Sequence, residues 1–206
     1  MLIEIERVKP KPIPQRIIDR SEIWGRKIKI EPNSFNLISA QSGMGKSTLL
    51  HILFGLRHDY LGEVKIDGKH ARPKKWKDWE VFRRERISLL FQDLRLFAAL
   101  SARENIELIP LNNPTAPSID EMAKHLGMTE FLDRPMNNLS HGQRQRVALI
   151  RALRKPFELL LLDEPFSHLD KENQSRACSL VDEVTRSNKA GSVSYTHLRA
   201  HETTNY

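Results

Sequence analysis

The alternation of apolar and polar residues divides the chain into short strands and helices. Residues 2–8 (LIEIERV) alternate apolar with charged positions, which is typical of a half-buried strand. Further strands are expected at residues 27–30, 34–38, 62–66, 86–91 and 158–162. Helices are expected at residues 46–54, 143–153 and 171–186, and residues 93–138 show short helical segments separated by turn residues. Strands and helices interleaved in this way predict an α/β fold.

A Gly-rich segment, AQSGMGKST, follows one predicted strand and opens a predicted helix. Such a turn aims backbone N–H groups at one point, and the helix dipole adds partial positive charge there. Gly43 and Gly45 let the backbone approach a phosphate, Lys46 can reach its oxygens, and Ser47 offers a hydroxyl to Mg²⁺. The usual pattern begins with Gly, and Ala40 replaces it here, which is acceptable if its φ is negative. The predicted nucleotide-binding residues are Ala40, Gln41, Ser42, Gly43, Met44, Gly45, Lys46, Ser47 and Thr48.

An acidic pair follows the most apolar predicted strand. Four consecutive Leu, at residues 159–162, suit a strand buried on both faces of a parallel sheet. Carboxylates at the C-terminal end of such a strand lie in the crevice where α/β sheets bind ligands. We therefore expect Asp163 to hold Mg²⁺ and Glu164 to act as general base toward the attacking water.

Three further motifs resemble those of the ATP-binding cassette (ABC) ATPases. LSHGQ, residues 139–143, resembles the LSGGQ signature of that family, and Gln92 in LLFQDLRLF stands at the place of its Q-loop. FSHLD, ending in Asp170, resembles the D-loop. The resemblance covers residues 27 to about 182. It implies a P-loop NTPase with an ABC-type core, a small antiparallel β subdomain and a helical subdomain at about residues 93–140.

The resemblance also implies how the site is assembled. In this family two cassettes pair head to tail, and each ATP lies between the phosphate loop of one and the signature of the other. The nucleotide contacts from the second chain would be Ser140, His141, Gly142 and Gln143, with Asp170 at the seam. Gln92 would contact Mg²⁺ or water and sense the membrane partner. Ser140 and Gln143 also fit a capping box at a helix start.

Two departures from the family pattern concern His141 and the adenine platform. His141 replaces the first signature Gly, either as a tolerated variant or as the basis of a pH-sensitive ATPase. The family usually has an aromatic residue upstream of the phosphate loop, but this region is Pro-rich. Trp24 is the nearest candidate to stack on adenine, and the alternative is that it packs in the core.

The partners implied by the resemblance are a second cassette, as a homodimer or a pair, and an integral membrane permease subunit. The chain would then lie peripherally on the cytoplasmic face of the inner membrane. Leu96, Phe97 and Leu100 would line the groove for the permease, or form the core of the helical subdomain. FQDLRLF and LSARENI are most similar to lipoprotein-releasing, macrolide-exporting and cell-division cassettes. A non-transporting cell-division ATPase and a soluble ABC ATPase remain the alternatives.

Net charge, hydropathy and cysteine content bear on the partners and the compartment of the chain. The net charge of +7 and pI of about 9.6 are compatible with anionic surfaces, and the densest basic cluster, RPKKWK, is interpreted as a solvated face. No nucleic-acid partner is expected. No apolar run approaches the ~20 residues of a membrane span, and no signal-peptide profile is present. The lone Cys178 is expected to be a small buried hydrophobe, and a cytosolic chain is expected.

The last residues are interpreted as foreign to the domain. VSYTHLRAHET, residues 193–203, resembles the in-frame translation of a sequencing adaptor. His197 stands about where the family's switch His belongs, but in this interpretation it is not that residue. The expected organisation is one ABC ATPase domain at residues 1–191, truncated at its C-terminus, and a non-native tail at 192–206. Such a chain would bind ATP yet hydrolyse it poorly.

Overall fold

A parallel sheet carries the predicted motifs. The computed structural model describes residues 1–41, 43–72, 76–110, 113 and 115–196. The strands of this sheet are β3 (Phe35–Ser39), β8 (Gly191–Thr196), β7 (Leu159–Asp163) and β6 (Ile87–Leu90), in that spatial order. Every neighbouring pair is parallel, with Leu90 opposite Leu162 and Asp163 opposite Tyr195. All carboxyl ends therefore lie at one edge, the place where such sheets bind ligands.

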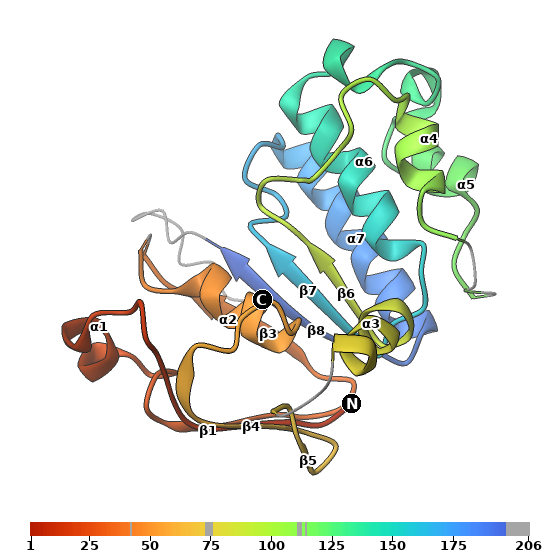
Figure 1. The fold of residues 1–206 in the computed structure, drawn as a ribbon. Helices are drawn as coiled ribbons and strands as arrows, with labels where there is room; N and C mark the ends of the chain where they lie inside the picture. Colours follow the sequence, from red (N-terminus) through yellow and green to blue (C-terminus); the bar gives the residue numbers. More distant parts are fainter. Residues whose placement is uncertain (42, 73–75, 111–112, 114, 197–206) are drawn as a thin grey trace.

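A second, antiparallel sheet lies apart from the first (Figure 1). Its order is β2 (Lys27–Ile30), β1 (Ile3–Pro10), β4 (Tyr60–Ile66) and β5 (Lys69–His70). The alternation noted along residues 2–8 places Ile3 and Ile5 fully inside the core. This sheet is the predicted small β subdomain.

Helix α2 (Lys46–Leu53) lies between the two sheets (Figure 1). Its apolar side chains, Leu49, Leu50 and Leu53, join a core that contains residues of both sheets, including Leu161 of β7. The helix that begins at the phosphate loop is thus fixed from two sides, which holds its N-terminus rigidly.

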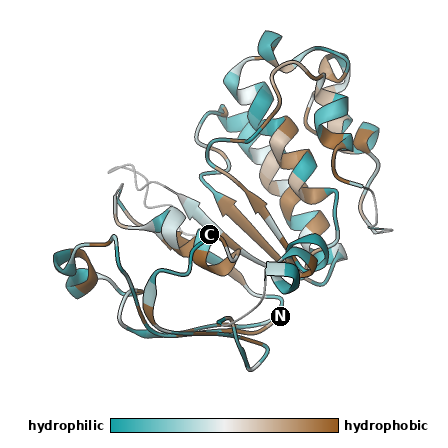
Figure 2. Ribbon diagram, in the orientation of Figure 1, coloured by the Kyte–Doolittle hydropathy of each residue, from teal (hydrophilic) through white to brown (hydrophobic). Residues whose placement is uncertain are grey.

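The opposite face of the parallel sheet is covered by α6 (His141–Leu153) and α7 (Lys171–Ser187). Figure 2 shows the apolar faces of these helices meeting the strands. Short helices complete the predicted helical subdomain: α4 (Ala102–Glu107), α5 (Ile119–His125), η1 (Thr129–Phe131) and η2 (Met136–Asn138). They share one buried cluster with α6 and α7. The fold class predicted from the sequence is therefore confirmed.

Two helices and two strands, β5 and β8, were not expected. Helix α1 (Gln15–Arg20) lies in the Pro-rich segment and begins directly after Pro14. Pro is tolerated at a helix start because the N–H that it lacks has no partner inside the helix there. Helix α3 (Trp76–Glu85) begins inside the basic cluster and buries only Trp79 and Phe82. The short strand β5 completes the hairpin that turns at Asp67–Gly68.

The basic cluster is not uniformly a solvated face. The Arg72 guanidinium donates hydrogen bonds to the carbonyls of His58, Tyr60 and Gly62, at 3.1, 2.9 and 2.9 Å. It also lies 3.9 Å from the centre of the Tyr60 ring. Arg72 therefore stabilises strand β4, whereas Trp76 is 69% exposed.

Strand β8 extends past residue 191, where the domain was expected to end. Val193 and Tyr195 are buried between the sheet and helix α2, at 0% and 1% exposure. The parallel sheet therefore continues through residue 196, with β8 paired to β3 on one side and to β7 on the other. His197, the position of the switch His, lies outside the described residues.

Cys178 is exposed, and its predicted burial is wrong. The buried stripe of α7 runs through Ala177, Leu180, Val181 and Val184, so residue 178 falls just beside it.

None of the helices among the described residues combines the length and the apolar composition that a membrane span needs.

Candidate functional site

The phosphate loop joins β3 to α2 and depends on a left-handed glycine. Gly45 is the N-cap of α2 with φ of +91°, a conformation that residues with a Cβ rarely adopt. A Cβ at this position would overlap Ile13 and lie 3.0 Å from the indole nitrogen of Trp24. The sequence AQSGMGKST therefore needs Gly at 45 for both backbone and space.

The side chain of Trp24 contacts the phosphate loop from the core. Its side chain is 3% exposed, and its indole N–H donates a hydrogen bond to the carbonyl of Met44 at 3.1 Å. The ring belongs to the buried core, as the core-packing alternative expected, and it also lines the cavity beside the loop. A cavity of about 570 Å³ adjoins the loop, and its wall includes Arg20, Ile23 and Ser39.

Lys46 points back across the loop toward the acidic pair. Its ammonium group donates to the carbonyl of Ala40 at 3.0 Å and lies 3.3 Å from Glu164 Oε1. The two side chains are 7% and 9% exposed. The predicted phosphate-binding lysine and the predicted general base thus meet at the carboxyl edge of the sheet.

Asp163 ends strand β7 and is 4% exposed. Burial raises the pKa of its carboxyl group, although a hydrogen bond from Ser47 opposes that change. Its Oδ1 atom is buried without a hydrogen-bond partner among the described residues. A buried carboxylate oxygen without a partner, next to a Ser hydroxyl, suits a hard cation, so these residues fit Mg²⁺.

Glu164 has a left-handed backbone with φ of +52°. Such a conformation is uncommon for a residue with a Cβ and persists only where the surroundings hold it. Its carbonyl accepts hydrogen bonds from Gln145 Nε2 at 2.9 Å and from Ser167 Oγ at 3.2 Å. The side chain of Gln145, which sequence reasoning missed, therefore fixes the backbone that presents the carboxylate.

Gln92 is exposed just beyond strand β6. Strand β6 ends at Leu90, opposite Leu162 of β7, so Gln92 follows at the carboxyl edge of the same sheet. The position agrees with the Q-loop role that the resemblance implies.

The signature begins helix α6 as expected. Ser140 is its N-cap: the hydroxyl accepts from the N–H of Gln143 at 3.2 Å, and Gln143 Oε1 accepts from the N–H of Ser140 at 2.8 Å. The predicted capping box is confirmed, so these two N–H groups are satisfied within the chain and the start of the helix is fixed at Ser140.

His141 and Gly142 both face the D-loop. The ring centres of His141 and His168 are 4.0 Å apart. Burial and the charges of His168 and Arg144 lower the pKa of His141. A Cβ at Gly142 would lie 2.8 Å from the carbonyl oxygen of His168. The signature and the D-loop of one chain are thus packed together.

Asp170 is the N-cap of α7. Its carboxylate accepts from both the backbone and the side-chain nitrogens of Asn173, each at 2.8 Å. These bonds lower the pKa of the Asp170 carboxyl group. The residue predicted at the dimer seam therefore also begins the helix after the D-loop.

The remaining predicted positions lie around this site. Gln41 and Gly43 are exposed, Met44, Ser47 and Thr48 are half-buried, and Ser42 lies outside the described residues.

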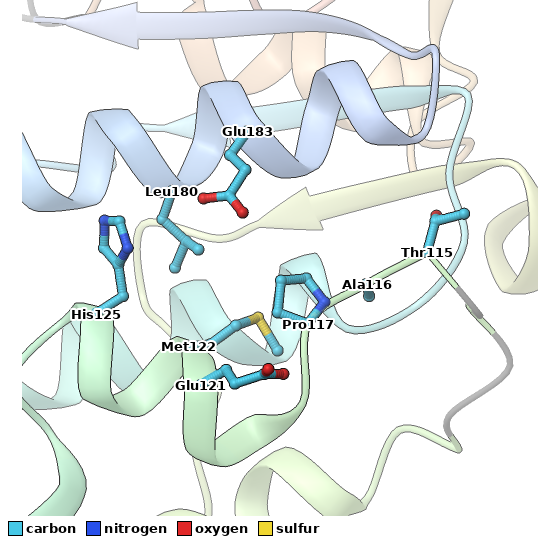
Figure 3. Close-up of a pocket in the computed structure, with 8 residues that line it drawn as sticks. All are labelled: Thr115, Ala116, Pro117, Glu121, Met122, His125, Leu180 and Glu183. Carbon is cyan, nitrogen blue, oxygen red and sulfur yellow. The ribbon is translucent and has the colours of Figure 1, made fainter.

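A smaller cavity of about 300 Å³ is lined by α5, α7 and the segment before α5 (Figure 3). Glu121 in its wall is already bonded to the N–H and hydroxyl of Ser118. That cavity contains none of the predicted site residues.

A phosphate loop, a buried acidic pair and a parallel sheet together define a P-loop nucleotide-binding protein. A family model described as ABC transporter matches residues 25–167. The chain belongs to this family. It is 37% identical over 168 residues to the thiamine import ATP-binding protein ThiQ of Vibrio parahaemolyticus, across 79% of this chain and 69% of that protein. It is 34% identical to the sugar transport ATP-binding protein MsmK of Streptococcus mutans, across 82% of this chain and 45% of MsmK.

Solved structures agree. The dimeric ATP-binding cassette MJ0796 bound to ADP and Pi has a TM-score of 0.79 and 27% identity, covering 98% of this chain and 88% of that one. A second dimeric structure of MJ0796 has a TM-score of 0.75 and 29% identity, covering 94% and 87%. The chain is therefore an ATP-binding and ATP-hydrolysing subunit that powers an ABC transporter.

Proposed function

We propose that two copies of this chain, or one copy and a related cassette, enclose two ATP molecules head to tail. The observation that carries this proposal is the meeting of Lys46, Asp163 and Glu164 at one edge of the sheet, while Ser140 begins a separate helix. One chain then supplies two half-sites. The dimeric form of MJ0796 supports the arrangement.

In each half-site the phosphate loop binds the triphosphate through backbone N–H groups and Lys46. The carboxylate of Glu164 accepts the proton of the attacking water, and the N-terminus of α6 with the Ser140 hydroxyl stabilises the γ-phosphate charge from the other copy. Ser47, Asp163 and Gln92 would hold Mg²⁺, which neutralises developing phosphate charge when bound. His141, Gly142 and Gln143 would border the same phosphate, and Asp170 would lie at the seam.

Disulfide crosslinking tests the head-to-tail arrangement. The native Cys178 is exposed, so it is first replaced by Ser. One chain then carries Ser140→Cys and the other Gln41→Cys, both with Glu164→Gln to slow hydrolysis. We expect an ATP-dependent crosslink between the two chains and none between two Ser140→Cys chains. Equal crosslinking with and without ATP, or none at all, would contradict the arrangement.

We further propose an integral membrane permease as partner, which places the chain peripherally on the cytoplasmic face of the membrane. Phe97 supports this role, because it is 59% exposed beside the Q-loop while Leu96 packs on the subdomain core. The names of ThiQ and MsmK favour a transport cassette over a non-transporting cell-division type. The name of ThiQ describes an import protein, which favours import over lipoprotein release or macrolide export. The subfamily suggested by FQDLRLF stays a prediction.

A pull-down from detergent-solubilised membranes tests the partner. A multi-span permease should co-purify with the wild-type chain and be depleted by Phe97→Asp. Trp76→Asp, which alters an exposed aromatic residue outside the Q-loop segment, is the control. Equal recovery with Phe97→Asp would exclude this surface, and exclusive recovery of a soluble partner or nucleic acid would contradict the transporter assignment.

The origin of residues 192–206 is a separate proposal. We infer that the natural protein has a different sequence after Gly191, because residues 193–203 (VSYTHLRAHET) resemble the translation of a sequencing adaptor. Resequencing of the source locus tests this directly. Recovery of the same residues from genomic DNA would make them native, with β8 as their natural strand.

A further inference from the structure

Gln145 is the side chain of helix α6 that reaches the general base. It lies just after the signature and is 3% exposed. Its amide nitrogen donates to the carbonyl of Glu164 at 2.9 Å, and its amide oxygen accepts from the N–H of His168 at 3.3 Å. A buried amide that is satisfied at both ends fixes the groups it joins.

These two bonds bracket the segment between the acidic pair and the D-loop. Glu164, at the start of this segment, has the left-handed φ of +52°. Gln174 of α7 holds the later part, since its amide donates to the carbonyls of Phe166 and Leu169 at 3.2 and 2.9 Å. Gln145 and Gln174 thus make the same kind of contact, but only Gln145 contacts Glu164.

The other end of this contact is the signature. Ser140 and Gln145 belong to the start of one α-helix, which transmits displacement as a rigid element. On the far side, the Glu164 carboxylate lies 3.3 Å from Lys46 in the phosphate loop. A continuous series of contacts therefore runs from Ser140 through Gln145 to Glu164 and Lys46.

We propose that Gln145 is a positioning residue that holds Glu164 in its left-handed conformation and links the two half-sites of one chain. The inference rests on the proposed head-to-tail dimer. When the signature engages the γ-phosphate of the other copy, movement of α6 reaches the backbone of Glu164 through Gln145. The base of one half-site is thereby aligned by occupation of the other.

The test compares Gln145→Met with Gln174→Met in the full chain. Met preserves length and removes both hydrogen bonds without burying a charge. We expect Gln145→Met to lower kcat by about tenfold, with the dissociation constant for ATP changed by less than about twofold. Gln174→Met should leave kcat within about twofold of wild type, although both variants lower the melting temperature. Equal loss of kcat in both variants, or none in Gln145→Met, would overturn the proposal.

A double-mutant cycle separates positioning from general destabilisation. In the Glu164→Gln background, Gln145→Met should cause no further loss of turnover, because the base that it positions is already absent. A further tenfold loss would show that Gln145 acts elsewhere. If Gln145→Met fails to fold, Gln145→Asn takes its place: it keeps a neutral amide but is one methylene too short to reach both Glu164 and His168.

The outcomes for the dimer and for Gln145 remain distinct. A wild-type chain that does not bind ATP, or never forms the ATP-dependent crosslink, would contradict the proposed function. A wild-type chain that does both, with normal kcat in the folded Gln145 variant, would contradict the positioning role alone.

Discussion

The ammonium group of Lys46 lies 3.3 Å from Glu164 Oε1, with both side chains almost completely buried. The same ammonium group donates to the Ala40 carbonyl at the start of the loop. A buried ion pair of this kind is costly to break by removing one partner. The contact ties the phosphate-binding loop to the residue that would activate water, and it determines what a change at either residue should do.

Glu164→Gln should separate binding from hydrolysis. The amide retains the size of the side chain but cannot accept a proton, so turnover should fall by about 10²- to 10⁴-fold. ATP affinity should remain close to wild type, because the phosphate contacts come from the loop. Single-turnover hydrolysis and nucleotide titration measure the two quantities. Glu172→Gln, on the exposed surface of α7, is the control, and equal turnover in wild type and Glu164→Gln would mean that the base is another residue.

Asp163→Asn should stabilise the metal-free protein while abolishing hydrolysis. Burial raises the pKa of Asp163 in the folded state, so the folded protein favours the protonated carboxyl group. The stability from that preference is complete below the ordinary pKa of 3.8 and is lost as pH rises through the raised value. At neutral pH the ionised side chain therefore costs free energy that Asn does not.

Thermal unfolding in a chelator measures this effect. The melting temperature of Asp163→Asn should exceed that of wild type by a few degrees at pH 7, from on the order of 1 kcal/mol, and by less near pH 4.5. Asp182→Asn, on the surface of α7, is the control and should show no such gain. A lower melting temperature for Asp163→Asn at pH 7 would contradict the sign of this argument.

His141→Gly should alter the pH dependence of nucleotide binding. The charged groups beside His141 are His168 and Arg144, and together with burial they lower its pKa below the ordinary 6.5. Its positive charge therefore develops only as pH falls below that value, where it would attract the γ-phosphate of the other copy. ATP affinity of wild type relative to His141→Gly should rise by up to about fivefold from pH 8 to pH 6.

The control for this measurement is His70→Asn, which alters an exposed His of the antiparallel sheet. Parallel affinity profiles for wild type and His141→Gly over this range would make His141 a tolerated local variant. Burial and the contact with His168 lower the pKa of His141, so any positive charge on this ring develops toward the acidic end of the range.

Gly45→Ala should damage the phosphate loop more than backbone strain alone predicts. The left-handed φ costs about 1 kcal/mol for Ala, and the added methyl group would also overlap Ile13 and approach Trp24. Gly68→Ala is a matched control, because Gly68 has φ of +74° and nothing within 4 Å of an added Cβ. We expect urea unfolding to show about twice the destabilisation at position 45, together with loss of ATP binding. Equal destabilisation at the two positions would show that the loop adapts.

The contiguous motifs could be predicted because their chemistry lies in neighbouring residues. Lys46 and Ser47 follow a strand and begin a helix, and Asp163 and Glu164 end a run of Leu, so sequence order places them correctly. The capping box of Ser140 and Gln143 is local in the same sense.

Contacts between distant segments could not be predicted in this way. Gln145 meets Glu164, and Trp24 meets Met44, only after the helices and the sheets have packed. Local signals also failed where charge dominates the composition: α3 buries only Trp79 and Phe82 among charged residues, so its apolar stripe is weak. Strand β8 was not predicted, because the resemblance of VSYTHLRAHET to an adaptor translation removed these residues from the expected domain.

Gly142 and His141 show how unequally two adjacent signature positions tolerate larger side chains. Any Cβ at Gly142 would press on the His168 carbonyl at 2.8 Å and displace the D-loop, whereas the imidazole at 141 is exposed at the surface. One position is therefore closed to every other amino acid, and the next admits even a bulky ring. Of these two positions, a side chain is therefore accommodated at 141, where this chain carries His, and not at 142 unless the D-loop moves.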